Sequence, residues 1–209
     1  MTAPSLKGLN DVARISPVPR AEWSSEMTNF ITDFRSSVKG DRPEAGRQSG
    51  ANLLGTLACH PALAMAFLTF NGHLLYGSTL SARQRELLIL RVAALRRCDY
   101  EWAQHVLLGE AAGIQAEEIV RVSEGPDAPG WTSIEQSLLR AADELLADGA
   151  VSGGTWKVLQ GEFDDQQLMD VVFTVGAYEL VAMALRSFDV EPEAGLVPHH
   201  PGWRPPAPA

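Results

Sequence analysis

The chain has 209 residues and a formal net charge of −9, and no basic stretch offers the phosphate-neutralising surface that general nucleic-acid binding needs. Hydrophobic residues make up 45% of it, which argues against a disordered or fibrous protein. Two cysteines, Cys59 and Cys98, are too few for a disulfide scaffold and favour a reducing compartment, so we expect a cytoplasmic protein. We also find no signal-peptide pattern, and we expect no apolar run long enough to cross a bilayer.

The first third of the chain predicts an arm followed by helices. Prolines interrupt the first twenty residues, which we expect to lie extended over a surface. Apolar residues then recur at helical spacing on both sides of a loop rich in glycine and charge. The predicted helical segments are residues 21–38, 51–58 and 62–75.

The stretch "ARQRELLILRVAALRR" predicts a helix with an unusually apolar interior. Ser81 precedes it as a candidate N-cap, and Gln84 stands at the position that completes a capping box. Because apolar residues occupy several faces, we expect this helix to be buried in a bundle or an oligomer interface.

The second half of the chain continues the helical pattern. A helix after Cys98 is expected to end at Gly113, a natural residue for a left-handed helix terminus. A short helix "IQAEEIVRVS", a turn-rich linker "EGPDAPGW" and three further helical segments follow. Strand signals are weak throughout, so we predict an all-α protein with three parts: an extended arm (1–20), one helical domain (21–190) and a proline-rich tail (191–209).

The stretch "RRCDYEWAQH" holds the candidate chemistry. Cys98, Glu101 and His105 are spaced so that all three lie on one face of a helix. Cys98 is expected at the N-terminal edge of that helix, where the dipole favours a thiolate, but Asp99 and Glu101 oppose this effect. Glu101 is well placed to fix the tautomer of His105, so the pattern favours acid–base chemistry over thiol redox chemistry.

Simpler interpretations of the same residues stay open. A glutamate–histidine pair at this spacing is often a solvated helical contact, and a lone cysteine is usually a small buried apolar residue. Tyr100 and Trp102 belong either to the core or to the lining of a pocket. Glu86 lies in the first turn of its helix, where a carboxylate suits the dipole without further role. With only one convincing histidine we expect no metal site.

The stretch "LSARQRELLILRVAALRRCDYEWAQHVLLGEAAGIQAEEI" resembles the carboxymuconolactone decarboxylase family, which includes the alkylhydroperoxidase D proteins. The resemblance implies an all-α helical bundle that assembles into homo-oligomers, trimers or hexamers, with the active site between helices and near subunit contacts. The hydroperoxidase branch carries a glutamate, a C-x-x-C pair and a histidine, which correspond here to Glu86, Cys98 and His105. Glu101 occupies the second cysteine position, so a local disulfide is excluded and a peroxidase would need Cys59 or an external thiol.

The decarboxylase branch needs no cysteine pair, and it implies a small anionic lactone as substrate and no cofactor. By this resemblance His105 is the acid–base group oriented by Glu101, and Glu86 is a second proton relay. Arg97 or Arg91 is expected to hold the substrate carboxylate. We therefore expect an enzyme that transfers a proton in the decarboxylation of a small lactone or carbonyl acid, with a Cys98 peroxidase and a non-catalytic binding oligomer as alternatives.

Overall fold

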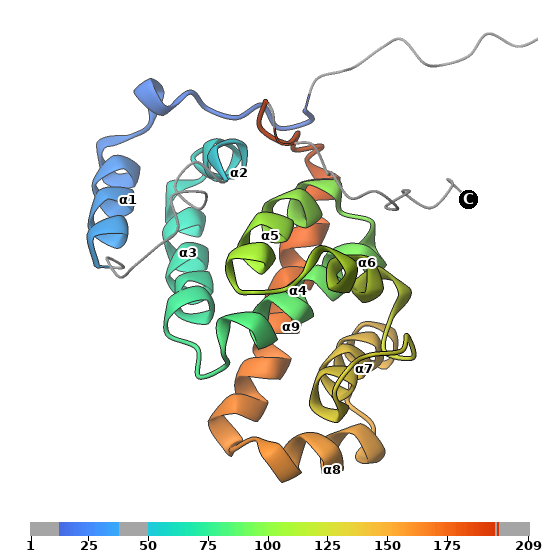
Figure 1. The fold of residues 1–209 in the computed structure, drawn as a ribbon. Helices are drawn as coiled ribbons and strands as arrows, with labels where there is room; N and C mark the ends of the chain where they lie inside the picture. Colours follow the sequence, from blue (N-terminus) through green and yellow to red (C-terminus); the bar gives the residue numbers. More distant parts are fainter. Residues whose placement is uncertain (1–12, 38–49, 195, 197–209) are drawn as a thin grey trace, which may run out of the picture.

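The computed structural model describes residues 13–37, 50–194 and 196, and all regular secondary structure in this part of the chain is helical. This confirms the predicted all-α class. The helices pack around one another as a bundle, with α1–α3 on one side and α6–α8 on the other (Figure 1). The elements are η1 (Arg20–Glu22), α1 (Ser25–Ser37), α2 (Ala51–Leu57), α3 (Pro61–Tyr76), α4 (Ala82–Arg96), α5 (Asp99–Ala111), α6 (Ala116–Glu124), α7 (Ser133–Asp148), α8 (Gly153–Glu162) and α9 (Asp165–Ser187).

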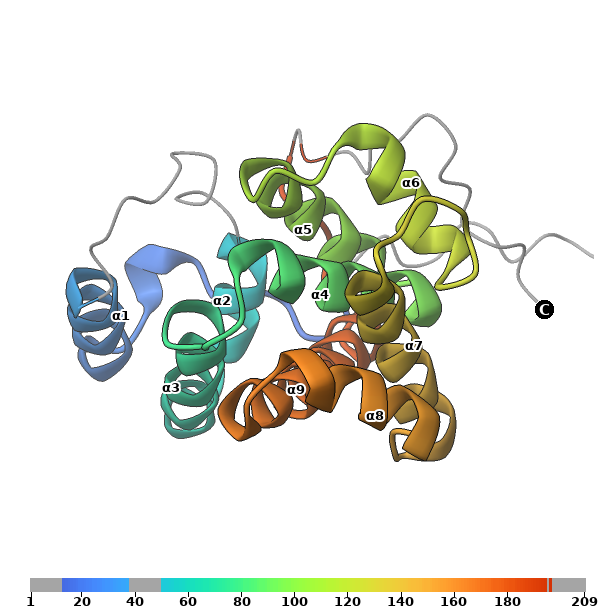
Figure 2. The same cartoon turned by 60° about the horizontal axis from the view of Figure 1, so that its bottom comes forward.

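Helix α4 is the centre of the bundle and packs against α5, α6, α7 and α9 (Figures 1 and 2). Its eight consecutive residues from Glu86 to Ala93 are buried, because neighbouring helices cover it on every side. The predicted capping box is present: the Ser81 hydroxyl accepts from the N–H of Gln84, and the Gln84 side chain accepts from the N–H of Ser81. The predicted burial of this apolar helix is confirmed.

The beginning of the domain differs from the predicted helix over 21–38. A 3₁₀ turn occupies Arg20–Glu22, and the Ser24 hydroxyl accepts a hydrogen bond from the N–H of Met27, so α1 begins only at Ser25. Serine is a strong N-cap because its hydroxyl satisfies an otherwise unpaired helical N–H. Val38 lies outside the described residues.

The described part of the predicted arm, residues 13–19, carries no helix and crosses the end of α2. The N–H of Val18 donates to the carbonyl of Gly55, and a Cβ at Gly55 would lie 2.8 Å from the Cβ of Pro17. Glycine at this position therefore lets the arm approach the helix closely. Residues 1–12 of the predicted arm and 197–209 of the predicted tail lie outside the described residues.

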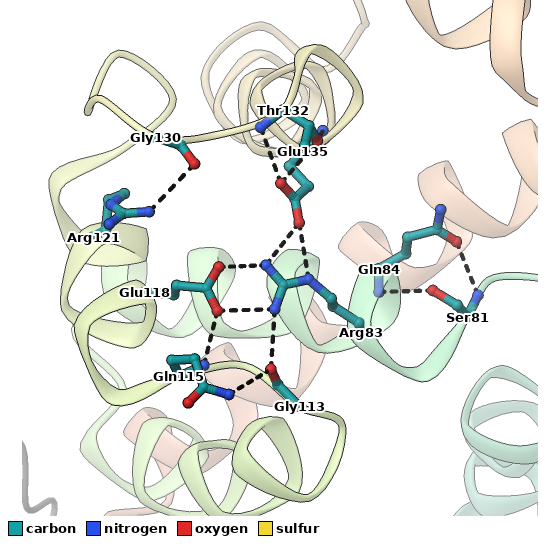
Figure 3. A network of polar contacts seen from close by, with 10 residues as sticks. All are labelled: Ser81, Arg83, Gln84, Gly113, Gln115, Glu118, Arg121, Gly130, Thr132 and Glu135. Atoms are coloured by element: carbon teal, nitrogen blue, oxygen red, sulfur yellow. Dashed lines mark hydrogen bonds and ion pairs between the residues drawn. The ribbon is translucent and has the colours of Figure 1, made fainter.

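Arg83 joins three helices at one end of the bundle (Figure 3). Its guanidinium binds the carboxylates of Glu118 on α6 and Glu135 on α7, at 2.6 and 2.7 Å, and donates to the carbonyl of Gly113. The Arg83 hydrogen bond holds the pKa of Glu118 below its usual value. Gly113 itself has φ +84°, as predicted for the residue that ends α5. This network fixes α6 and α7 against α4.

Helix α9 is long and apolar enough, by length and composition, to cross a membrane: it has 23 residues and a mean hydropathy of 1.7 over its best window. The prediction that no run reaches this length is therefore wrong. Half of that window is buried inside the protein, as in the core helix of a globular fold. Asp170 accepts hydrogen bonds from Ser78 and Thr79, so the helix carries a buried carboxylate satisfied by the α3–α4 turn.

Candidate active site

The site is formed where α4, α5 and α9 meet. Helix α4 ends at Arg96, and Arg97 takes a left-handed conformation with φ 53° before Cys98 becomes the N-cap of α5. This short reversal folds α5 back along α4. As a result Glu86, near the start of α4, reaches His105 in the middle of α5.

Glu86 and His105 form a buried pair. The Nδ1 atom of His105 lies 2.7 Å from Oε2 of Glu86. The His105 side chain is 9% exposed and the Glu86 side chain 2%. Arg85 donates to the other oxygen of Glu86. Within the part of the chain that the structure describes, Nε2 of His105 makes no hydrogen bond. A carboxylate on Nδ1 fixes the tautomer, so Nε2 is the nitrogen left to exchange a proton with a ligand.

Glu101 does not orient His105, and that prediction is wrong. Glu86 takes this place, because the reversal after α4 brings a carboxylate distant in sequence to Nδ1 of His105. Both carboxyl oxygens of Glu101 are buried and make no hydrogen bond within the described residues. Burial, with the nearby charge of Glu179, raises the pKa of Glu101 well above the usual carboxyl value. Burial therefore favours the protonated form of Glu101.

Cys98 is a buried thiol, 1% exposed, in the largest apolar cluster of the protein. Burial, and then the charge of Glu101, raises the pKa of Cys98 to about 12. The favourable position at the N-terminus of α5 does not overcome these effects. At neutral pH the thiolate that peroxide chemistry requires is scarce.

Tyr178 on α9 completes the group and was not among the residues expected from the sequence. Its ring meets the imidazole of His105 edge to face, with centroids 5.0 Å apart and planes at 89°. Burial, followed by the charges of Glu86 and Glu101, raises its pKa well above the usual value.

The three predicted substrate-binding residues are Tyr100, Trp102 and Arg97, and each has different surroundings in the structure. The Tyr100 hydroxyl donates to the Glu193 carboxylate at 2.7 Å and so attaches the segment after α9 to α5. Trp102 is fully buried in the apolar cluster between α4, α5 and α6. Arg97 is exposed at the left-handed turn. A role for them in substrate binding stays a prediction.

Arg91, the other candidate for the substrate carboxylate, is engaged inside the protein. Its guanidinium donates to both oxygens of Asp143, at 2.6 and 2.9 Å, and to the carbonyls of Val122 and Ser123. The side chain is 8% exposed. These contacts join α4, α6 and α7, so Arg91 has a structural role.

We therefore expect Arg91→Met to lower the free energy of unfolding by about 3–5 kcal/mol, because it leaves Asp143 and two carbonyls without their partner. Arg140→Met is the matched control, since the Arg140–Asp127 pair is 39% and 83% exposed and should contribute only about 0–1 kcal/mol. Urea unfolding of the two variants measures the difference. Equal losses would contradict the structural role of Arg91.

Among residues 13–37, 50–194 and 196, no group of three or more His, Cys, Asp or Glu side chains is arranged to hold a metal ion.

Comparison with known proteins agrees with the helical architecture. Residues 61–144 match the model of the carboxymuconolactone decarboxylase family. An uncharacterized peroxidase-related protein from Silicibacter sp. TM1040 has a TM-score of 0.71 at 16% identity, covering 94% of this chain and all of that one. An alkylhydroperoxidase AhpD core protein from Ralstonia eutropha JMP134, also called peroxidase-related, has a TM-score of 0.68 at 19% identity. The match covers 90% of this chain and 95% of that one. No curated protein sequence matches. At these identities the structural likeness shows the fold alone.

Proposed function

We propose that this chain, whose residues 61–144 match the model of the carboxymuconolactone decarboxylase family, is a cofactor-independent enzyme that transfers a proton during decarboxylation of a small lactone or carbonyl acid. The observation that carries the proposal is the buried Glu86–His105 pair, which holds Nδ1 and leaves Nε2 of the imidazole for a ligand. Proton transfer by a positioned histidine is the commonest form of acid–base catalysis.

The reaction divides into two steps that these side chains can serve. The bond between the substrate and its carboxylate breaks, CO₂ leaves, and the electron pair stays on the substrate as an enolate or dienolate. A proton then passes from Nε2 of the His105 imidazolium to the carbanionic carbon, and water restores that proton afterwards. Glu86 stabilises the imidazolium before transfer.

Two further groups support the enolate in this proposal. Glu101 is a buried acid with a raised pKa, and its oxygens have no partner among the described residues, while the Tyr178 ring lies edge to face against His105. Both can donate a hydrogen bond to the oxygen where negative charge develops. Donors that are already in place stabilise such charge strongly.

The alternative is a peroxidase that uses Cys98, favoured by the likeness to peroxidase-related proteins over nearly the whole chain. In that reaction the thiolate attacks a peroxide oxygen, an alcohol leaves, and the resulting sulfenic acid is reduced by a second thiol. Glu101 stands where a resolving cysteine would be, and Cys59 is exposed on the surface while Cys98 is buried. The raised pKa of Cys98 makes its thiolate scarce at neutral pH, which favours the proton-transfer proposal.

The rate of peroxide oxidation separates the two proposals. We expect Cys98 to react with hydrogen peroxide and with an organic hydroperoxide no faster than an ordinary buried thiol, because its pKa of about 12 leaves little thiolate at neutral pH. Mass spectrometry of the oxidised protein measures the rate, with Cys98→Ser as the control. Rapid oxidation that a reductant reverses would establish the peroxidase instead.

A third proposal from the sequence, a non-catalytic oligomer that binds a small molecule, predicts no turnover of any related substrate. The homo-oligomeric assembly, as a trimer or hexamer, and the cytoplasmic location stay predictions.

A further inference from the structure

Helix α9 carries a stripe of exposed apolar side chains on the face opposite the site. Met169, Phe173, Leu180 and Met183 are 59%, 50%, 53% and 52% exposed, and Gly176 lies at the middle of the same face. The intervals between these five positions are four, three, four and three residues. This spacing is that of a helix packed along another helix. We call these five residues the α9 stripe.

The packing within one chain does not account for the stripe. A Cβ added at Gly176 would meet nothing within 4 Å, so no neighbouring group requires glycine there. Glycine within a helix costs about 0.5–1 kcal/mol relative to alanine. The opposite face of α9 packs on α4 and α7, while Figure 2 shows α9 at the edge of the bundle between α3 and α8.

The stripe is nearly symmetric about Gly176. Phe173 lies three residues before Gly176 and Leu180 four residues after it. Met169 and Met183 lie seven residues before and seven residues after it. A contact between identical surfaces across a twofold axis requires such self-complementarity. A small residue at the crossing point also lets two helix backbones approach closely.

We propose that two copies of this chain pair through α9, with the two helices antiparallel and crossing at Gly176. Phe173 of one copy then packs against Leu180 of the other, and Met169 packs against Met183. Phe70 of α3 extends the contact, because its ring already meets Phe173 edge to face at 6.2 Å.

Charge favours the antiparallel orientation. Asp165 lies at the first turn of α9 and Arg186 at the last, and both are exposed. No ion pair joins either of them to another described residue. An antiparallel pair brings Asp165 of each copy to Arg186 of the other and also opposes the two helix dipoles.

The exposed area of the α9 stripe is enough for a weak but specific contact. A half-exposed side chain of this size offers roughly 100 Å², so the stripe and Phe70 together bury about 1,000 Å² over the two copies. That lies at the lower limit for a specific interface. A lipid surface is a poorer partner, because Asp170 and Glu179 bind Thr79 and Arg96 and keep α9 within the bundle.

Disulfide trapping tests the geometry of the pair. In a Cys59→Ser background, Gly176→Cys should form a disulfide-linked dimer within minutes under mild oxidation. Val158→Cys, at an exposed apolar position on α8, is the matched control and should remain largely unlinked. Mixing Phe173→Cys with Leu180→Cys protein should give mixed dimers in excess of either homodimer. Homodimers in excess would overturn the antiparallel arrangement, and equal linkage of Val158→Cys would overturn the site of contact.

Sedimentation velocity tests the pair without added cysteines. The unmodified chain should sediment as a dimer or a multiple of it, and Leu180→Glu should raise the dissociation constant at least about tenfold, while Val158→Glu should not. A monomer, a bare trimer or an insensitive Leu180→Glu variant would overturn the proposal. So would binding of the unmodified chain to phosphatidylcholine or phosphatidylglycerol vesicles that Leu180→Glu abolishes, since the stripe would then contact lipid.

Discussion

Replacement of His105 by glutamine is expected to lower kcat/KM by about 10²–10⁴, the contribution of a positioned acid–base group. Glutamine can still donate to Glu86 through its amide, so the buried carboxylate keeps a partner and the fold is preserved. It cannot exchange a proton at the position of Nε2. Steady-state decarboxylation of carboxymuconolactone, followed by release of CO₂, is the measurement.

Variants of the neighbouring residues distinguish the roles within the site. Glu86→Gln should also reduce kcat, because the tautomer of His105 is no longer fixed by a carboxylate. Cys98→Ser should change kcat/KM only a few-fold, since the thiol is protonated and buried among apolar side chains. An active His105→Gln variant together with an inactive Cys98→Ser variant would contradict the proposal and support the peroxidase.

The fold could be predicted from the sequence because its signals are local. Ser81 and Gln84 mark the start of α4, the apolar interior of α4 predicts its burial, and Gly113 marks the end of α5. Each of these depends on residues within a few positions of one another, where periodicity and capping are informative. The start of α1 differs most from its predicted position, because the Ser24 cap was not recognised within an otherwise helical pattern.

The site could be predicted only in part, because its partners are distant in the sequence. Helical spacing placed Glu101 beside His105, but the left-handed Arg97 turns α5 back so that Glu86 reaches the imidazole. No local pattern links Tyr178 to His105, which lie on different helices. Arg91 could equally have held a substrate carboxylate, and only the position of Asp143 on α7 shows that its charge is already balanced.

We expect the residue at position 101 to decide whether this site can perform thiol chemistry. Glu101→Cys should raise the rate of Cys98 alkylation at neutral pH at least about 100-fold and allow a disulfide to form. The change replaces a buried carboxyl, and it places a second thiol one helical turn away from Cys98 at the N-terminus of α5. Paired cysteines at this spacing on a helix N-terminus have depressed pKa values.

Iodoacetamide labelling measures the reactivity in that experiment, and mass spectrometry detects the loss of two hydrogens when the disulfide forms. Glu101→Ser is the matched control, because it removes the same carboxyl without supplying sulfur and should raise the alkylation rate less and give no disulfide. If Glu101→Cys stays as unreactive as the unmodified chain, burial of Cys98 rather than the neighbouring carboxyl suppresses its nucleophilicity. The lack of access to the Cys98 thiol from the surface, and not the residue at position 101, would then be what prevents thiol peroxidase chemistry in this chain.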